Sequence, residues 1–118
     1  MYEASVIADF SSAHNLRNYK GKCENVHGHN WKVELSVVSD ELDTQGMVAD
    51  FKGLKEMLKG LLEELDHKNL NDIDYFKKVN PTSENIAKYL YDKIKDRGVN
   101  VSLVKVWESD TSYATYKE

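Results

Sequence analysis

The sequence has few of the residues that cross-link or interrupt small proteins. Its 118 residues include one cysteine, Cys23, and one proline, Pro81. A single thiol excludes a disulfide within the chain, so we expect a protein of the reducing cytoplasm. Pro81 stands where a helix is expected to begin, and no repeat or low-complexity segment suggests a linker.

Long apolar runs and basic clusters are also missing. No apolar run approaches the roughly 20 residues of a membrane-spanning helix, and residues 1–4 lack the features of a signal peptide. The formal net charge is −4, and no basic stripe with interleaved aromatics favours nucleic-acid binding. The composition, 41% apolar and 31% charged, predicts a globular protein with one domain over residues 1–118.

Four segments alternate apolar and polar residues with a period of two, which is typical of strands. The first two span about residues 2–12 and 27–38, and a loop is expected between them. The last two, about residues 99–108 and 113–116, are joined closely enough to predict a hairpin.

The central part of the chain predicts two helices. From about residue 51 to 65, apolar residues recur every three or four positions, and Asp50 is placed to cap the first turn. A second helix opens at residues 80–84 and ends at Arg97-Gly98. The order β-β-α-α-β-β predicts an α+β fold, with two helices on one face of a four-stranded antiparallel sheet. Ile7 and the terminal tyrosines suggest that the other face meets further subunits.

All four histidines can be assigned to one site. His27 and His29 begin the second strand and share its apolar face with Trp31. Alone, this pattern would predict two partly buried histidines bonded to backbone carbonyls. His14 follows the first strand, which can pair with the second. Three imidazoles without a neighbouring carboxylate cluster are typical of a catalytic zinc site with an open fourth position.

Cys23 lies four residues before His27. It could be a fourth zinc ligand, which would make the site closed and structural, or an inert apolar residue. However, it lies in a polar loop beside Lys22, and a neighbouring cation lowers the pKa of a thiol. We interpret Cys23 as a thiolate that acts as general base or nucleophile.

Two further candidates follow the predicted helices. Asp66-His67 is either a polar helix end or a carboxylate that orients an imidazole for proton transfer. Glu108 shares a strand face with Val104 and Val106, where an unpaired carboxylate is costly. It is either solvated at the strand end or a bidentate acceptor for a planar ligand edge.

The loop around Cys23 is locally basic in an acidic chain. Arg17, Lys20 and Lys22 all fall within it. These side chains form either an ordinary solvated loop or a docking surface for an anionic substrate such as a phosphate ester.

Five motifs follow one another along nearly the whole chain. They are Phe10-Ser11-Ser12-Ala13-His14, Cys23-x-x-x-His27-Gly28-His29, Leu65-Asp66-His67-x-x-Leu70-Asn71, Pro81-Thr82-Ser83-Glu84-Asn85 and Trp107-Glu108-Ser109. In this order the set resembles the 6-pyruvoyl-tetrahydropterin synthase superfamily. The three residues between Cys23 and His27 resemble the bacterial 6-carboxy-5,6,7,8-tetrahydropterin synthase branch, because the pyruvoyl-forming branch typically has five. Ser83 replaces a threonine of some relatives and keeps the hydroxyl.

The resemblance implies the tunnelling fold, in which subunits close into a barrel, usually as a hexamer of two trimers with sites between subunits. It implies conversion of 7,8-dihydroneopterin triphosphate to 6-carboxytetrahydropterin, triphosphate and acetaldehyde, a step of queuosine (7-deazaguanine) biosynthesis. One zinc ion per subunit would be held by His14, His27 and His29. Cys23, Asp66 and His67 would be catalytic, and Glu108, Thr82 and Ser83 would bind the pterin.

Three other functions remain open at this point. The first is the pyruvoyl-forming reaction on the same substrate. The second is a dihydroneopterin aldolase or epimerase, a class that shares the fold and needs no zinc. The third is a non-enzymatic zinc module in which Cys23 is the fourth ligand.

Overall fold

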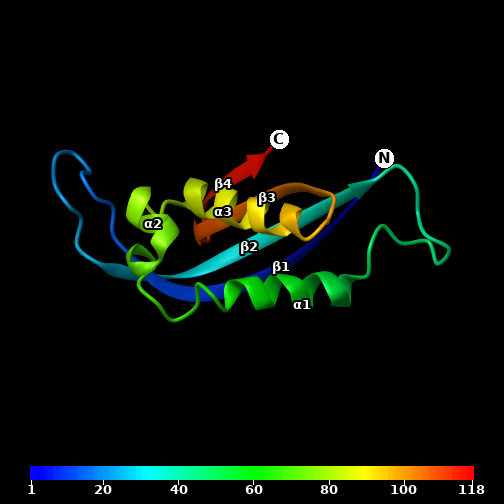
Figure 1. The fold of residues 1–118 in the computed structure, drawn as a ribbon, viewed down its shortest axis with the longest axis horizontal. Coiled ribbons are helices and arrows are strands. Elements are labelled where there is room, and N and C mark those ends of the chain that lie inside the picture. Colours follow the sequence, from blue (N-terminus) through cyan, green and yellow to red (C-terminus); the bar gives the residue numbers. More distant parts are fainter.

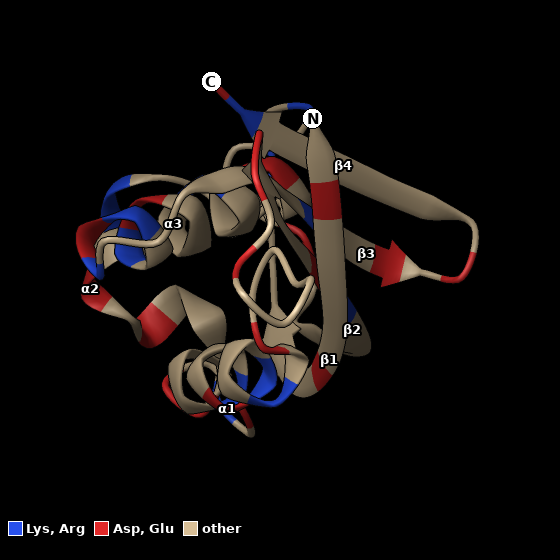
Figure 2. Ribbon diagram, turned by 90° about the vertical axis from the view of Figure 1, so that its right-hand side faces the viewer, with Lys and Arg blue, Asp and Glu red and all other residues tan.

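The computed structural model describes residues 1–118. Its elements are β1 (Tyr2–His14), β2 (His27–Ser39), α1 (Phe51–Leu62), the 3₁₀ turn η1 (Leu70–Asp72), α2 (Asp74–Lys78), α3 (Ser83–Asp96), β3 (Val101–Ser109) and β4 (Ser112–Lys117). The strands form one antiparallel sheet in the order β1-β2-β3-β4. The helices lie on one face of this sheet (Figures 1 and 2). None of them combines the length and the apolar character that crossing a bilayer requires.

The expected order of four strands and two long helices is confirmed. The first strand runs to His14, and the first helix ends at Leu62, earlier than expected. The short elements η1 and α2 were not predicted, because segments of three and five residues are too short to show a helical repeat.

The core fills the space between the sheet and the helices. Trp31, Val33 and Leu35 of β2 are fully buried, and their side chains alternate with polar ones on the other face. Leu58 of α1 and Leu90 of α3 cover them from the helical side. Burying each large apolar side chain stabilises the fold by roughly 1.5–3 kcal/mol.

Side-chain caps fix where the helices begin. The Asp50 side chain accepts a hydrogen bond from the backbone N–H of Lys52, and Thr82 accepts one from that of Asn85. Gly98, just after α3, has φ 80°, a left-handed conformation that glycine adopts without strain. Both helices therefore start where the sequence predicts. The cap at Thr82 fixes the beginning of α3.

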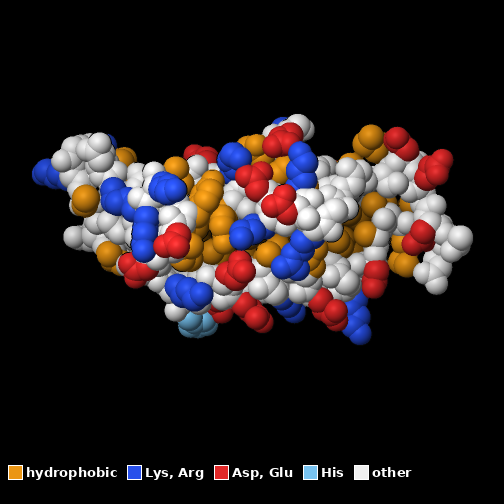
Figure 3. Space-filling model, in the orientation of Figure 1, with side chains coloured by type: hydrophobic (Ala, Val, Ile, Leu, Met, Phe, Trp, Pro, Cys, Tyr) orange, Lys and Arg blue, Asp and Glu red, His pale blue; other side chains and the backbone are white.

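The two surfaces of the molecule differ. On the outer sheet face, the Lys32 ammonium lies 4.0 Å from the ring centre of Trp107, and Ile7 and Tyr113 are half exposed. Over the helices, acidic and basic side chains are interspersed (Figure 3). The edge strands β1 and β4 each have only one neighbour in the sheet, which leaves pairing positions open.

Candidate metal centre

Strand register brings three imidazoles together. In the antiparallel pairing of β1 with β2, His14 lies opposite His27 and Ser12 lies opposite His29. Because side chains alternate along a strand, all three histidines lie on the core-facing side with Trp31. The ring centroid of His14 is 4.8 Å from that of His27 and 5.0 Å from that of His29. The structure thus brings His14 to the His27–His29 pair, as the sequence led us to expect.

Glu108 of β3 joins this group. One donor atom from each of His14, His27, His29 and Glu108 lies within 4.8 Å of the other three. Oε1 of Glu108 is 3.3 Å from Nε2 of His29. Sequence reasoning gave Glu108 a ligand-binding role and missed this proximity. The proximity follows from the register of β2 with β3, which sets Trp107 opposite Lys32 and so carries the next residue toward the histidines.

Backbone carbonyls orient two of the rings. Nδ1 of His14 is 2.8 Å from the carbonyl oxygen of Pro81, and Nδ1 of His27 is 2.9 Å from that of Asn25. A carbonyl can only accept, so each Nδ1 carries the proton and each Nε2 keeps a lone pair. Histidines that bind metals are usually held in this way, by a hydrogen bond from the other ring nitrogen.

The centre contains polar atoms that the chain itself leaves without partners. Nε2 of His14 is buried and makes no hydrogen bond, and such an atom costs about 1–3 kcal/mol. Nε2 of His29 is also buried without a hydrogen bond, and Oε1 of Glu108 lies 3.3 Å from it. Burial lowers the pKa of His29. The neighbouring His14 and His27 lower it further, whereas the Glu108 carboxylate raises it. Neutral imidazoles with free lone pairs are the form that binds metals. The residues present therefore fit a divalent metal such as zinc.

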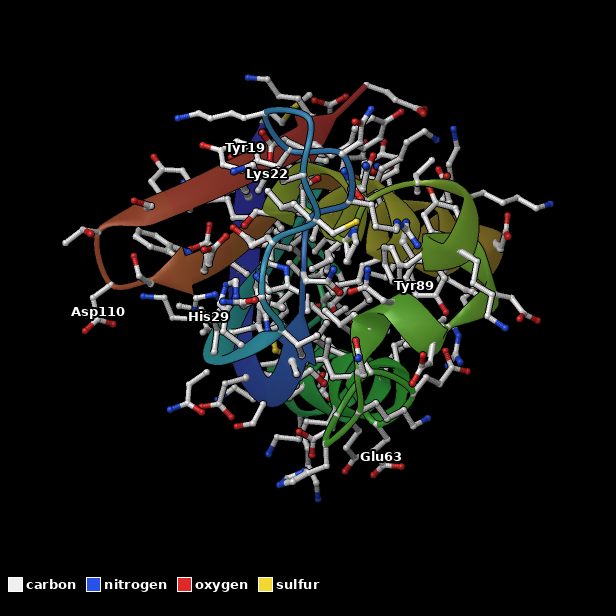
Figure 4. The ribbon with its side chains drawn as sticks, turned by 90° about the vertical axis from the view of Figure 1, so that its left-hand side faces the viewer. Tyr19, Lys22, His29, Glu63, Tyr89 and Asp110 are labelled. Carbon is white, nitrogen blue, oxygen red and sulfur yellow. The ribbon has the colours of Figure 1, made fainter.

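Cys23 lies outside this donor group. It is exposed and lines a surface hollow with Tyr19, Lys22 and other residues of the loop between β1 and β2. Figure 4 shows Tyr19 and Lys22 on this loop and His29 at the beginning of β2. Because Glu108 and not Cys23 completes the group of four donors, the geometry does not favour a closed structural site with a cysteine ligand.

Arg17 is not part of a free basic patch. Its guanidinium donates to the carbonyl oxygens of Phe76 and Val79, the latter at 2.8 Å. The side chain of Arg17 is thus used within the fold, which does not support the docking role considered for this residue. Lys20 and Lys22 remain exposed in the loop.

Asp66 and His67 form a pair against the outer edge of β1, where the backbone N–H of His67 donates to the carbonyl oxygen of Ser11. Oδ2 of Asp66 is 2.9 Å from Nδ1 of His67. The backbone N–H of Ser11 donates to Oδ1 of Asp66 at 2.8 Å, and this bond, with a smaller contribution from His67, lowers the pKa of Asp66. His67 has φ 55°, which is uncommon for a residue with a side chain.

The imidazole of His67 is not in the donor group. Its side chain is 82% exposed. It lines an open hollow of ≈460 Å³ together with Ser11, His29 and Asn30. The Asp66 carboxylate thus contacts the His67 imidazole, and the imidazole faces solvent.

The two residues expected to support a pterin lie beside the centre. Thr82 and Ser83 directly follow Pro81, whose carbonyl binds His14. Oγ1 of Thr82 accepts from the N–H of Asn85 at 3.1 Å, and Ser83 is buried. Capping the helix therefore already uses part of the hydrogen-bonding capacity of Thr82.

The match to known proteins covers the whole site. The model of the family described as 6-pyruvoyl tetrahydropterin synthase matches residues 3–118. The chain belongs to this family. The match includes the histidines, Cys23, the Asp66–His67 pair and Glu108.

Relatives within the 6-pyruvoyl tetrahydropterin synthase family have two different names. The 6-carboxy-5,6,7,8-tetrahydropterin synthase of Aquifex aeolicus is 39% identical over 124 residues, with 82% of this chain and 76% of the relative covered. The enzyme of that name from Synechocystis is 41% identical, with 91% and 86% covered. The human 6-pyruvoyl tetrahydrobiopterin synthase is 40% identical, with 91% and 77% covered. The expectation of an enzyme of this family is confirmed, but overall identity does not separate the two names.

Solved structures of the family have the same fold. The 6-pyruvoyl tetrahydropterin synthase of Caenorhabditis elegans superimposes with a TM-score of 0.87 at 31% identity, covering 99% of this chain and 95% of the other. The Plasmodium falciparum 6-pyruvoyl tetrahydropterin synthase structure superimposes with a TM-score of 0.76 at 23% identity, which shows the shared fold alone. The predicted α+β fold class is thus confirmed.

Proposed function

We propose that the chain is a zinc-dependent 6-carboxy-5,6,7,8-tetrahydropterin synthase. It would convert 7,8-dihydroneopterin triphosphate and one water molecule to 6-carboxy-5,6,7,8-tetrahydropterin, triphosphate and acetaldehyde, as part of queuosine biosynthesis in the cytoplasm. The observation that carries this proposal is the set of three imidazoles whose ring nitrogens lie within 4.8 Å of one another and of a Glu108 carboxylate oxygen. Relatives with this enzyme name support it, and so does the spacing of Cys23 and His27.

His14, His27 and His29 would hold the metal, one ion per subunit. When bound there, zinc supplies a Lewis acid for oxygen atoms of the substrate side chain. Glu108 would accept hydrogen bonds from the amino-pyrimidine edge of the pterin, with Thr82 and Ser83 in support. Its side chain is 39% exposed, so the carboxylate can be reached from solvent while it borders the donor group.

Cys23 and His67 would move protons on opposite sides of the substrate side chain. Asp66, within 2.9 Å of His67, would hold that imidazole and favour its charged form after it takes a proton. Triphosphate would then leave by elimination, and the remaining carbon–carbon bond would break in a retro-aldol-like step. Each acid–base group is expected to contribute roughly 100- to 10,000-fold to the rate.

The complete site would lie between subunits. The side chain of His67 is exposed and lies outside the donor group, so it is available to a neighbouring chain. The edge of β4 and the part of the β1 edge before Ser11, which residues 66–69 do not occupy, would pair when subunits close into a barrel, in a homohexamer of two trimers. Molar mass from light scattering tests the hexamer.

Mixing two inactive variants tests the shared site. Cys23→Ala and His67→Ala subunits, denatured and refolded together, should regain part of the activity if each site takes these residues from different chains. Each variant refolded alone is the control. No recovery in mixed oligomers, shown to be mixed by mass spectrometry, would place both residues in one chain.

Product identity tests the reaction. Zinc-loaded protein is incubated with 7,8-dihydroneopterin triphosphate, and the products are identified by mass. Acetaldehyde and 6-carboxytetrahydropterin are the expected products. The alternative, 6-pyruvoyl-tetrahydropterin formation, is favoured by the 40% identity to the human synthase, and it would give triphosphate without acetaldehyde.

A further inference from the structure

One asparagine connects the metal-binding end of β1 with the beginning of α3. Oδ1 of Asn80 accepts from the backbone N–H of Arg17 at 2.9 Å and from its Nε at 3.3 Å. Nδ2 of Asn80 donates to the carbonyl oxygen of Arg17 at 3.0 Å. The amide side chain therefore uses its acceptor and its donor on one residue that lies 63 positions away in the sequence.

The backbone around Asn80 extends this connection into the site. The carbonyl oxygen of Asn80 accepts from the N–H of Thr82 at 2.8 Å and from Nδ2 of Asn85 at 2.9 Å. The next carbonyl, that of Pro81, accepts from Nδ1 of His14. Asn80 thus has direct hydrogen bonds to both sides of the junction between β1 and α3.

Arg17 strengthens the same junction. Its guanidinium donates to the carbonyl oxygens of Phe76 and Val79, which precede Asn80. Arg17 lies three residues after His14 and six before Cys23, in the loop between β1 and β2. A displacement of Arg17 would therefore act on the metal-binding end of β1 and on the loop that carries the thiol.

We propose that Asn80 is a positioning residue, which fixes both His14 and the Cys23 loop against the beginning of α3. An amide is suited to this role because it must both donate to and accept from the backbone of Arg17. The role in metal binding rests on the proposed function, whereas the role in holding the loop does not.

Asn80→Ala removes all three side-chain hydrogen bonds to Arg17. Asn100→Ala is the matched control: Nδ2 of Asn100 donates to the carbonyl oxygen of Val38 at 2.9 Å, at the opposite end of β2. Asn80→Asp is the second variant. It keeps the acceptor, gains attraction to the guanidinium, and loses only the donor, so it provides a folded variant if Asn80→Ala does not fold.

Two measurements on the full-length proteins separate positioning from general stability. The first is zinc affinity, measured by competition with a chromophoric chelator and checked by the visible absorption of the cobalt-substituted protein. The second is the rate at which trypsin cleaves the native, metal-free protein after Lys20 or Lys22. Thermal unfolding of each variant records the general loss of stability.

For Asn80→Ala we expect zinc binding weakened about 10- to 100-fold, as for other residues that support metal ligands, and an altered cobalt spectrum. Loop cleavage should be about tenfold faster, because local opening becomes easier. Asn80→Asp should change in the same direction by less, and Asn100→Ala should match the wild type in both.

If both Asn80 variants match Asn100→Ala in affinity and cleavage, the proposal is wrong. A wild-type protein that binds no zinc would instead contradict the proposed function, and the cleavage rates would still decide the role of Asn80 in the loop.

Discussion

The two ends of the β1–β2 pair bury different chemistry on the same face. At one end Val6 lies opposite Leu35, and both are buried without polar atoms. At the other end His14 lies opposite His27, and Nε2 of His14 is buried without a hydrogen-bond partner. The first end gains stability from every buried methylene, whereas the second loses stability for each unpaired nitrogen. Such a difference within one strand pair is expected where a site needs donors free to bind a ligand.

Trp31 separates the two ends and contacts both. Its ring is fully buried and stacks 5.9 Å from that of Phe10 on the core side. On the other side its centroid is 4.9 Å from that of His14 and 5.2 Å from that of His29. Its indole N–H donates to the Ser12 carbonyl oxygen at 3.1 Å. The apolar core thereby provides the histidines with a rigid wall.

The largest expected effect comes from removing a donor at the site end. His14→Ala should weaken zinc binding by more than about 100-fold, beyond the loss typical of supporting residues, and should abolish turnover. His67→Ala is the control, because it removes an imidazole outside the donor group. Metal analysis after dialysis should find zinc in His67→Ala and none in His14→Ala. Full zinc occupancy in His14→Ala would mean that the donor group is not the metal site.

Cys23→Ala should separate catalysis from metal binding. Cys23 is exposed and lies outside the donor group, so zinc and pterin binding should be retained. Turnover should fall roughly 100- to 10,000-fold if the thiol transfers protons. Steady-state rates and zinc content, measured on the same preparation, check this. If zinc is lost as well, Cys23 is a ligand and its assignment as an acid–base group is wrong.

At the core end, a substitution should act on stability alone. Leu35→Ala is expected to lower the free energy of unfolding by about 2–5 kcal/mol, because it leaves a cavity among fully buried side chains. Leu42→Ala makes the same change at a side chain that is 40% exposed, and it should cost much less. Urea unfolding gives the difference, and zinc content per folded chain should stay unchanged. A selective loss of zinc in Leu35→Ala would contradict this prediction, because it would show that a cavity in the core also disturbs the metal-binding end of the strand pair.

The sequence was informative where the pattern itself carries the physics. Strand periodicity placed His27 and His29 on the core-facing side, and the position of His14 after the first strand anticipated its approach. These inferences needed only alternation and antiparallel pairing. The beginnings of α1 and α3 were predictable for a similar reason, since Asp50 and Thr82 are typical capping residues.

Other parts of the site left no signal in the sequence. The carbonyls of Pro81 and Asn25 orient two imidazoles, but any residue has a carbonyl, so no residue type marks them. The contact of Glu108 with His29 depends on the register between β2 and β3, which a bulge alters near Ser36. The hydrogen bonds of Arg17 also left no signal, because a charged side chain in a loop usually meets solvent. Here it reaches carbonyls more than 50 residues away in the sequence.

The smallest effect concerns charge at the site end, and it depends on pH. The Ser11 N–H, and secondarily His67, hold the pKa of Asp66 below its ordinary value of 3.8. A carboxyl with a depressed pKa stabilises the folded state above its unfolded pKa, and this contribution is lost as the pH falls through the folded value. Asp66→Asn, which can still accept from Ser11, should therefore have a slightly lower Tm than the wild type at pH 7. The difference should shrink below about pH 3.8. Thermal unfolding of the zinc-free proteins from pH 7 to 3 tests this, since protonation of the ligands would otherwise release the metal. The loss of Tm in Leu35→Ala should be independent of pH over the same range, because its cavity contains no titrating group. If the loss of Tm in Asp66→Asn were equally constant, the charge of Asp66 would not contribute to stability.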